Sequence, residues 1–165
     1  MDRQAFWVLF DEWCHLAESP TQVPQTVFDH LLHLPERDIV AFDRHLRARL
    51  ASSNNWLMWG AAHIITGASC PDGVFQNFRL WLLAHGQQTY EAINAEPDGL
   101  ADLDPRYGLL EPLLFIPTRA YEQVTGGLIP FTPVPNPHLD RAWTFDDEDA
   151  MKERYPRLCA LHPAY

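Results

Sequence analysis

Residues 56–66, WLMWGAAHIIT, are apolar almost all the way around a helical wheel. Trp56 and Trp59 fall on one side, and Met58 falls on the opposite side. A surface helix has one apolar face, whereas a helix that is apolar on every side is buried. We therefore expect this stretch to form a central helix against which the rest of the chain packs.

The chain on both sides of this stretch follows the same helical period of about 3.6 residues. Glycine or proline separates the segments, and the sequence has neither an alternating strand pattern nor a repeat of solenoid length. A length of 165 residues, 47% of them hydrophobic, is enough for one substantial core. The sequence predicts a mainly α fold, a compact multi-helix single domain with helices near residues 3–18, 24–33, 35–50, 72–86, 87–95 and 109–125.

Local signals predict where several of these helices begin and end. Asp72 is placed to cap the helix that Gly86 closes, because a carboxylate can accept from the free amides of the first turn. Pro117 is expected to kink the last long helix. Thr144 is expected to cap a short final helix, which Pro156 ends.

The composition changes after Gly127, where prolines follow at short intervals in the segment LIPFTPVPNP. Proline-rich segments favour extended conformations. We expect an extended strap that lies over the domain and is held by aromatic side chains; a free linker is the alternative. The chain then divides into a helical core, residues 1–127, and a proline-rich strap with a short helix packed on that core, residues 128–165.

The chain is acidic, with a formal net charge of -10. Nucleic-acid-binding proteins gather lysine and arginine into a patch. Here Arg44, Arg47 and Arg49 stand close to acidic residues and are typical of a solvated helix face. No segment approaches the roughly 20 apolar residues of a membrane span. The sequence therefore predicts neither nucleic acid nor a membrane as a partner.

The cysteines indicate a reducing compartment. Cys14, Cys70 and Cys159 are odd in number, widely spaced and without a CxxC pair, which fits neither a disulfide framework nor a zinc ribbon. The first apolar stretch contains Asp11, unlike the apolar run of a secretory signal. We expect a cytoplasmic protein.

Arg79 stands where a core-facing residue should be. On a helical wheel at about 100° per residue it falls about 40° from Phe75, inside the apolar arc of its helix. A buried guanidinium loses its hydration and needs a partner. Glu111 and Glu122, about 20° apart on the later helix, are the favoured partners. Together with Asp72, these three residues would form a structural polar core.

In the alternative interpretation, Arg79 faces a pocket and holds a carboxylate or a phosphate. Aromatic side chains around a few polar groups are typical of a ligand pocket. Asp72 would repel such a ligand, which weighs against this interpretation. The candidate ligand-binding residues are Arg79, His63, Trp56, Trp59, Trp81 and Tyr121.

No pattern in the sequence indicates a metal, a cofactor or a catalytic group. His30 and His33 share a helix face but have no third ligand with a known spacing. Cys14 and His15 point about 100° apart on a helix, which prevents an easy hydrogen bond between them. No P-loop, dinucleotide-binding glycine pattern or nucleophile elbow is present. We expect no metal, no cofactor and a non-catalytic role.

Several short motifs along the chain resemble those of a known family. They are FWVLFD at 6–11, WLMWGAA at 56–62, Cys70-x-Asp72-x-x-Phe75-x-x-Phe78-Arg79-x-Trp81-Leu82-x-x-x-Gly86, Pro97-Asp98-x-Leu100-Ala101, Ala120-Tyr121-Glu122 and Tyr155-Pro156-Arg157-Leu158. With them the chain resembles the DUF4240 family, a set of uncharacterised bacterial domains, over nearly its whole length. Two positions depart from the family pattern: His63, where an aromatic residue is commoner, and Gln87, where a basic residue is commoner.

Some members of that family are joined to WGR domains in proteins labelled as regulators of molybdate metabolism, so the resemblance implies a regulatory or interaction role. The favoured interpretation is a non-catalytic protein-interaction or regulatory module of a bacterial cytoplasm. Its partner is expected to be another protein, of basic character if the acidic surface makes the contact. The alternative is an enzyme or a protein that binds a small anion in a cleft around Trp56, His63, Arg79 and Tyr121.

Overall fold

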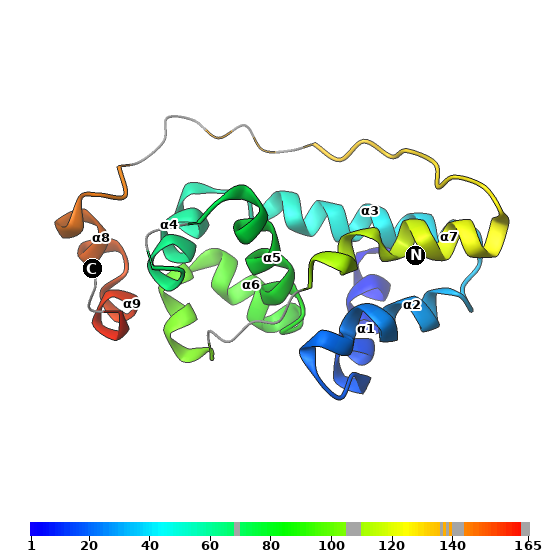
Figure 1. Ribbon diagram of the computed structural model, residues 1–165, viewed down its shortest axis with the longest axis horizontal. Helices are drawn as coiled ribbons and strands as arrows, with labels where there is room; N and C mark the ends of the chain where they lie inside the picture. The colour runs from blue at the N-terminus through cyan, green and yellow to red at the C-terminus, as the bar shows by residue number, and fades with distance from the viewer. Residues whose placement is uncertain (68–69, 105–109, 136, 138, 140–143, 163–165) are drawn as a thin grey trace.

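The structure is a computed structural model that describes residues 1–67, 70–104, 110–135, 137, 139 and 144–162, except for the side chain of Glu111. Its helices follow one another in three groups along the long axis of the molecule (Figure 1). No strand is present among the described residues. The mainly α fold expected from the sequence is confirmed.

The first group surrounds an aromatic core. It consists of α1 (Arg3–Leu16), α2 (Val23–Leu31), α3 (Glu36–Ser52) and α7 (Ile116–Thr125), with the short 3-10 turn η1 (Pro20–Gln22) before α2. Phe6 and Phe10 of α1 stack on each other and both pack against Phe42 of α3, and all three side chains are fully buried. Helix α7 returns late in the sequence to lie along α3 and α2 (Figure 1). The N-terminal group is therefore completed by residues that follow the second group in the chain.

The second group occupies the middle of the molecule. It consists of α4 (Trp56–Ile65), α5 (Asp72–Leu83), α6 (Gln87–Ala95) and the 3-10 helix η2 (Pro97–Asp102). Met58, Ala61 and Ala62 of α4 are fully buried, as its apolar composition predicts, whereas Leu57 is 41% exposed. Helix α4 contacts α5 and η2 on one side and the last helix of the chain on another. Its main contacts lie within the second and third groups, so it is a core helix of that half of the molecule and not one against which the whole chain packs.

Two expectations about the middle helices are wrong in detail. Asp72 is exposed in the first turn of α5 and caps nothing; the N-cap residue is Pro71. The segment expected to be one kinked helix is two, the 3-10 helix η3 (Glu111–Phe115) and then α7. Pro117 stands in the first turn of α7, where no proline N–H is needed, so it begins a helix rather than bending one.

The third group, at the C-terminal end, holds two helices where one was expected. They are α8 (Glu148–Arg154) and α9 (Pro156–Leu161). The cap of α8 is Asp147, whose side chain accepts from the amide of Ala150 at 3.0 Å, and not Thr144, which stands outside the helix. Pro156 does not end the first helix but begins the second, again at a first-turn position.

The contacts that attach the third group to the second include a tyrosine and two aspartates of η2, one of which, Asp102, forms an ion pair with Arg157 of α9. The Tyr155 hydroxyl donates to the Leu57 carbonyl at 2.7 Å, and its ring lies against Gly60, where a Cβ atom would come within 2.5 Å of the hydroxyl oxygen. The buried Asp98 carboxylate of η2 accepts from the amides of Arg157 and Leu158 in the first turn of α9. Asp98 thus caps α9 from a distant part of the chain.

Residues 128–135 of the strap leave the end of α7 as an extended segment (Figure 1). The described part of the strap does not use Phe131 as an aromatic anchor, because that side chain is 90% exposed. Thr132 and Val134 are half-buried instead and line a hollow with residues of α3 and α5. An aromatic contact appears further on, where Phe145 meets Trp56 of α4.

Candidate functional site

Arg79 is half-buried on α5 and closes the end of α3. Its Nη1 donates to the Leu50 carbonyl at 2.6 Å, in the last turn of α3. The last carbonyls of a helix lack intrahelical donors and carry the negative end of the helix dipole, so a cation suits this position. The guanidinium also lies over the ring of Phe75, 4.4 Å from its centre. Burial lowers the pKa of Arg79, against the opposing charges of Tyr90 and Asp72.

In the described part of the chain, the hydrogen-bond partner of Arg79 is a backbone carbonyl. This corrects the expected pairing with Glu122, while the expected pairing with Glu111 stays a prediction. Glu122 is exposed on α7 and makes no ion pair with Arg79 in the described part of the chain. The side chain of Glu111 lies outside the described residues. Asp72 is exposed, so neither it nor Glu122 belongs to a buried polar core. Wheel geometry placed Arg79 correctly but could not show a carbonyl from α3.

Arg79 also lines a cavity of about 550 Å³ between α4 and α5. One wall is a stack of three flat groups. The ring of Trp59 lies on the ring of Phe75, with the ring centres 3.7 Å apart, and the guanidinium of Arg79 also lies over the Phe75 ring. Trp56 and the C-terminal residues Leu139 and Phe145 line it as well. Four aromatic side chains and Leu139 make most of the cavity surface apolar, and Arg79 adds one fixed cation.

The polar part of the cavity is small. Asn54 and Gln76 contribute amide groups, and Asp72 contributes a carboxylate. Asn54 already accepts from the indole Nε1 of Trp59 at 3.2 Å, which fixes the orientation of that ring. Among the described residues, Nη2 of Arg79 makes no hydrogen bond. A ligand in this cavity would therefore meet a positioned donor beside aromatic walls.

His63 stands behind this cavity and does not line it. Its ring stacks on Phe145, with the ring centres 5.0 Å apart and the planes at 28°. Burial lowers the pKa of His63, although the charge of Asp146 opposes the effect. His63 thus supports the wall that Phe145 forms.

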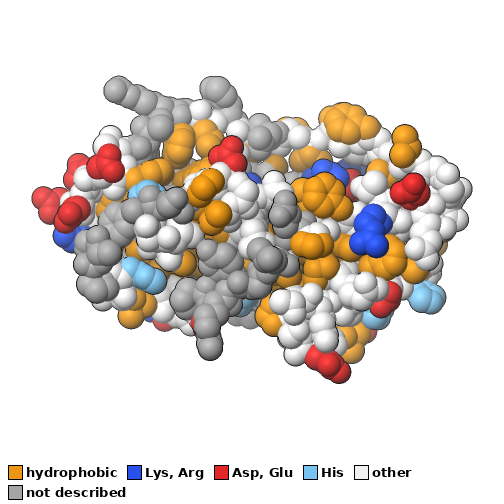
Figure 2. All heavy atoms as spheres, viewed as in Figure 1, with side chains coloured by type: hydrophobic (Ala, Val, Ile, Leu, Met, Phe, Trp, Pro, Cys, Tyr) orange, Lys and Arg blue, Asp and Glu red, His pale blue; other side chains and the backbone are white. Residues whose placement is uncertain are grey.

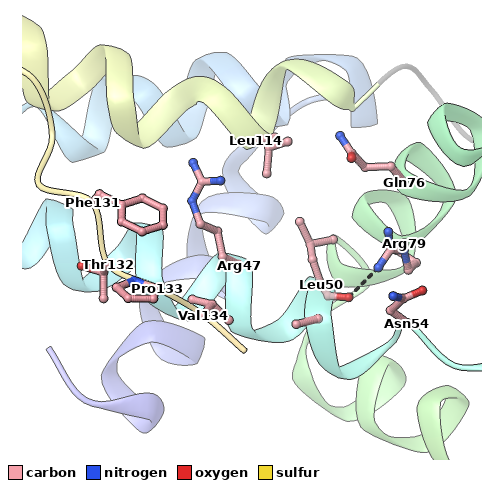
Figure 3. A pocket seen from close by; sticks show the side chains of 11 residues that line it. Arg47, Leu50, Asn54, Gln76, Arg79, Leu114, Phe131, Thr132, Pro133 and Val134 are labelled. Carbon is pink, nitrogen blue, oxygen red and sulfur yellow. Dashed lines mark hydrogen bonds between the residues drawn. The ribbon is translucent and has the colours of Figure 1, made fainter. Parts of the chain in front are cut away.

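A second hollow of about 380 Å³ adjoins the cavity, because Asn54, Gln76 and Arg79 line both (Figure 3). Its far end is formed by the strap and by Arg47 of α3. The Nε of Arg47 donates to both carboxylate oxygens of the buried Asp43 at 2.9 Å. The charge of Arg47 is thereby largely balanced, which leaves Arg79 as the stronger anion-attracting group of the two.

Trp56, Trp59 and Arg79 line one cavity as the cleft hypothesis predicts, but three other candidates, His63, Trp81 and Tyr121, do not line it. Trp81 is buried on the other side of α5, against His85. Tyr121 lies on α7 beside Glu36 and Arg37, at a separate hollow. The wheel of α5 gave a signal against Trp81, because it falls about 160° from Arg79 on the same helix.

The sequence did not indicate Phe75, Gln76 and Phe145 as site residues. Gln76 carries a weak signal, because it is a polar residue about 100° from Phe75, at the edge of the apolar arc that contains Arg79. Phe145 carries none, since it reaches the cavity from 86 positions beyond Trp59 through the tertiary fold.

The thiols of the chain are unsuited to nucleophilic chemistry. Burial, together with the charge of Asp11, raises the pKa of Cys14 to about 12. Burial also raises the pKa of Cys70 and of Cys159. The thiolate is the nucleophile, and a raised pKa keeps it scarce at neutral pH. Among the described residues, no three histidine, cysteine or acidic side chains gather as metal ligands would.

Several motif residues hold helices together rather than form a site. The Asp11 carboxylate accepts from the amide of Gln87 and so caps α6 from α1. Gly86, with φ of 89°, takes the left-handed conformation that lets the chain enter α6. No helix in the described part of the chain is long and apolar enough to cross a bilayer.

Comparison with known proteins assigns a family but no activity. No curated protein and no solved structure matches the chain. One family model, described as a protein of unknown function (DUF4240), matches residues 1–123. The match includes Trp56, Trp59 and Arg79 and ends before the strap, so the closing motif at 155–158 lies outside it. The chain belongs to the DUF4240 family.

Proposed function

We propose that this chain is a non-catalytic binding module whose cavity takes a small organic acid with a flat apolar body. The observation that carries the proposal is the stack of Trp59, Phe75 and Arg79 along one wall of a cavity of about 550 Å³. Ligand sites combine an apolar lining with a few positioned polar groups, in cavities of roughly 300–1,000 Å³.

The fixed position of the Arg79 guanidinium favours an acid as the ligand. Its guanidinium is held by the Leu50 carbonyl and by Phe75, so little ordering is needed when a ligand arrives. Hydrogen bonds between a guanidinium and a carboxylate are about twice as strong as neutral ones. Asp72 on the same cavity repels any anion, and it repels a phosphate or a dicarboxylate more strongly than a monoacid, so a monoacid is the favoured ligand.

The absence of a catalytic role is supported by the raised thiol pKa values and by the place of His63. That imidazole stacks behind Phe145 and does not line the cavity. We further propose that the protein works in the bacterial cytoplasm, since Cys14, Cys70 and Cys159 are all free thiols.

Calorimetric titration tests the ligand class. We expect 2-naphthylacetate to bind at least tenfold more tightly than 2-(2-naphthyl)ethanol, which has the same rings and no charge. Gln76→Ala should weaken the binding of the acid about 3- to 10-fold, as expected for one lost hydrogen bond. The matched control is Gln123→Ala, at an exposed position of α7. Equal binding of acid and alcohol, or equal behaviour of the two glutamine variants, would refute the proposal.

A protein-interaction role is the second candidate function. The observation that favours it is the exposure of two large apolar side chains in the strap, Leu128 at 84% and Phe131 at 90%. The net charge of -10 supports a partner with a basic surface.

A further inference from the structure

The start of the strap, residues 128–135, is constrained to an extended conformation by its own sequence, LIPFTPVP. Pro130, Pro133 and Pro135 each fix φ near -65°. A residue that precedes proline is pushed to the β or polyproline II region, which constrains Ile129, Thr132 and Val134 as well. Six of the eight residues in the segment are thus restricted to an extended backbone conformation. Figure 1 shows the segment in that extended form.

Most of the apolar side chains of the segment are exposed. Leu128, Pro130, Phe131, Pro133 and Pro135 are exposed, while Ile129, Thr132 and Val134 are half-buried. The exposure does not follow the three-residue turn of a polyproline II helix over the whole segment, because Val134 is half-buried where Leu128 and Phe131 are exposed. The segment therefore offers two large apolar side chains and three prolines to a partner.

The backbone of the segment is also open to a partner. In the part of the chain that the structure describes, no group of residues 128–135 makes a backbone hydrogen bond. The inward side is positioned by Thr132 and Val134 in the hollow above α3 (Figure 3). The segment follows α7 directly, after Gly126 ends that helix in the left-handed conformation. The segment is therefore extended next to α3, with its backbone groups open to a partner.

We propose that residues 128–135 are a docking motif for a partner domain that recognises polyproline II through a groove lined by aromatic side chains. Domains of the SH3, WW and EVH1 kinds bind such segments by packing successive ridges between aromatic rings, and they exploit the low entropy of a preformed extended chain. The segment has no charged residue, so the groove itself is apolar. The net charge of the whole chain, -10, favours a partner of basic character.

Figure 2 shows hydrophobic side chains on both halves of this face, including the half that holds α3 and α7. Phe131 supplies the largest exposed ring of the segment, and nothing in the described fold requires it to be there. This inference is independent of the cavity, and it gives the protein-interaction candidate a surface and a kind of partner.

A panel of purified SH3, WW and EVH1 domains, immobilised and probed with the full chain, tests the proposal. We expect at least one domain to bind, and Phe131→Ala and Pro133→Ala each to weaken that binding at least tenfold. The matched controls are Val124→Ala and Pro20→Ala, which also change an exposed apolar residue and an exposed proline. Because Phe131 is 90% exposed, its replacement leaves the folded state intact.

Binding to no domain of the panel overturns the proposal, and so does binding that the strap variants and the control variants weaken equally. Phe131→Ala should leave the titration with 2-naphthylacetate unchanged, and Gln76→Ala should leave domain binding unchanged. The two proposals can therefore fail separately.

Discussion

Replacing Gly60 by alanine should detach the C-terminal helices from α4. The added Cβ would lie 2.5 Å from the Tyr155 hydroxyl oxygen and 3.0 Å from two ring carbons, so the ring has to move. Overpacking of this kind costs about 1–3 kcal/mol. Loss of the 2.7 Å hydrogen bond to the Leu57 carbonyl adds about 1 kcal/mol. Alanine returns about 1 kcal/mol through its helix propensity. The expected net loss is about 1–3 kcal/mol in the free energy of unfolding.

Urea denaturation followed by tryptophan fluorescence measures this loss. Gly73→Ala is the matched control, because a Cβ there would meet nothing within 4 Å, and it should leave stability unchanged or raise it. In a Tyr155→Phe background, Gly60→Ala should cost less, since the closest contact has been removed. A Gly60→Ala protein as stable as the wild type, or an equal loss in both backgrounds, would show that the packing argument is wrong.

Three further changes test other contacts. Arg79→Met should lower the free energy of unfolding by about 1.5–3 kcal/mol in urea denaturation, because α3 loses a charged donor at its last turn. A loss of about 3–5 kcal/mol would instead indicate a broken buried ion pair. Asp98→Ala should lower the free energy of unfolding by about 1–2 kcal/mol and speed hydrogen exchange of the Leu158 amide, which loses its acceptor. Unchanged exchange of this amide would contradict the capping role of Asp98. Burial lowers the pKa of His63, so the folded state binds fewer protons than the unfolded state, and stability should fall as the pH drops below about 6.5. His63→Phe should reduce that slope in thermal denaturation, whereas a change at the exposed His33, such as His33→Gln, should not.

Helices were predictable wherever the signals lay within the helix itself. The helix at 87–95 has the bounds that the sequence indicates, since Gly86 precedes it and its apolar period is regular. Gly126 ends α7 in the left-handed conformation, as a glycine after a helix commonly does. The apolar arc of α5 placed Arg79 correctly on the inner side. The apolar periodicity and the glycines at helix ends therefore predicted most of the helices.

Partners supplied by distant elements were not predictable. Local capping rules suggested Asp72, yet the acidic residues that cap α6 and α9 are Asp11 and Asp98, far away in sequence. The partner of Arg79 is a carbonyl, and every residue carries one, so residue identity gives no signal for it. Phe145 was not predictable either, because it lines the cavity only through the tertiary fold, which brings the chain back to α4 after the strap.

Arg79 both closes α3 and lines the cavity, so its two roles need a variant that separates them. Lysine can still donate to the Leu50 carbonyl and keeps the charge at the end of α3. It lacks the planar fork of donors and the flat face that lies on Phe75, both of which the cavity uses. Arg79→Lys should therefore change the free energy of unfolding by less than about 1 kcal/mol while weakening the binding of 2-naphthylacetate about tenfold. Unchanged affinity would mean that the arginine of this cavity serves α3 alone, and the acid would then have to be recognised by the amides of Asn54 and Gln76.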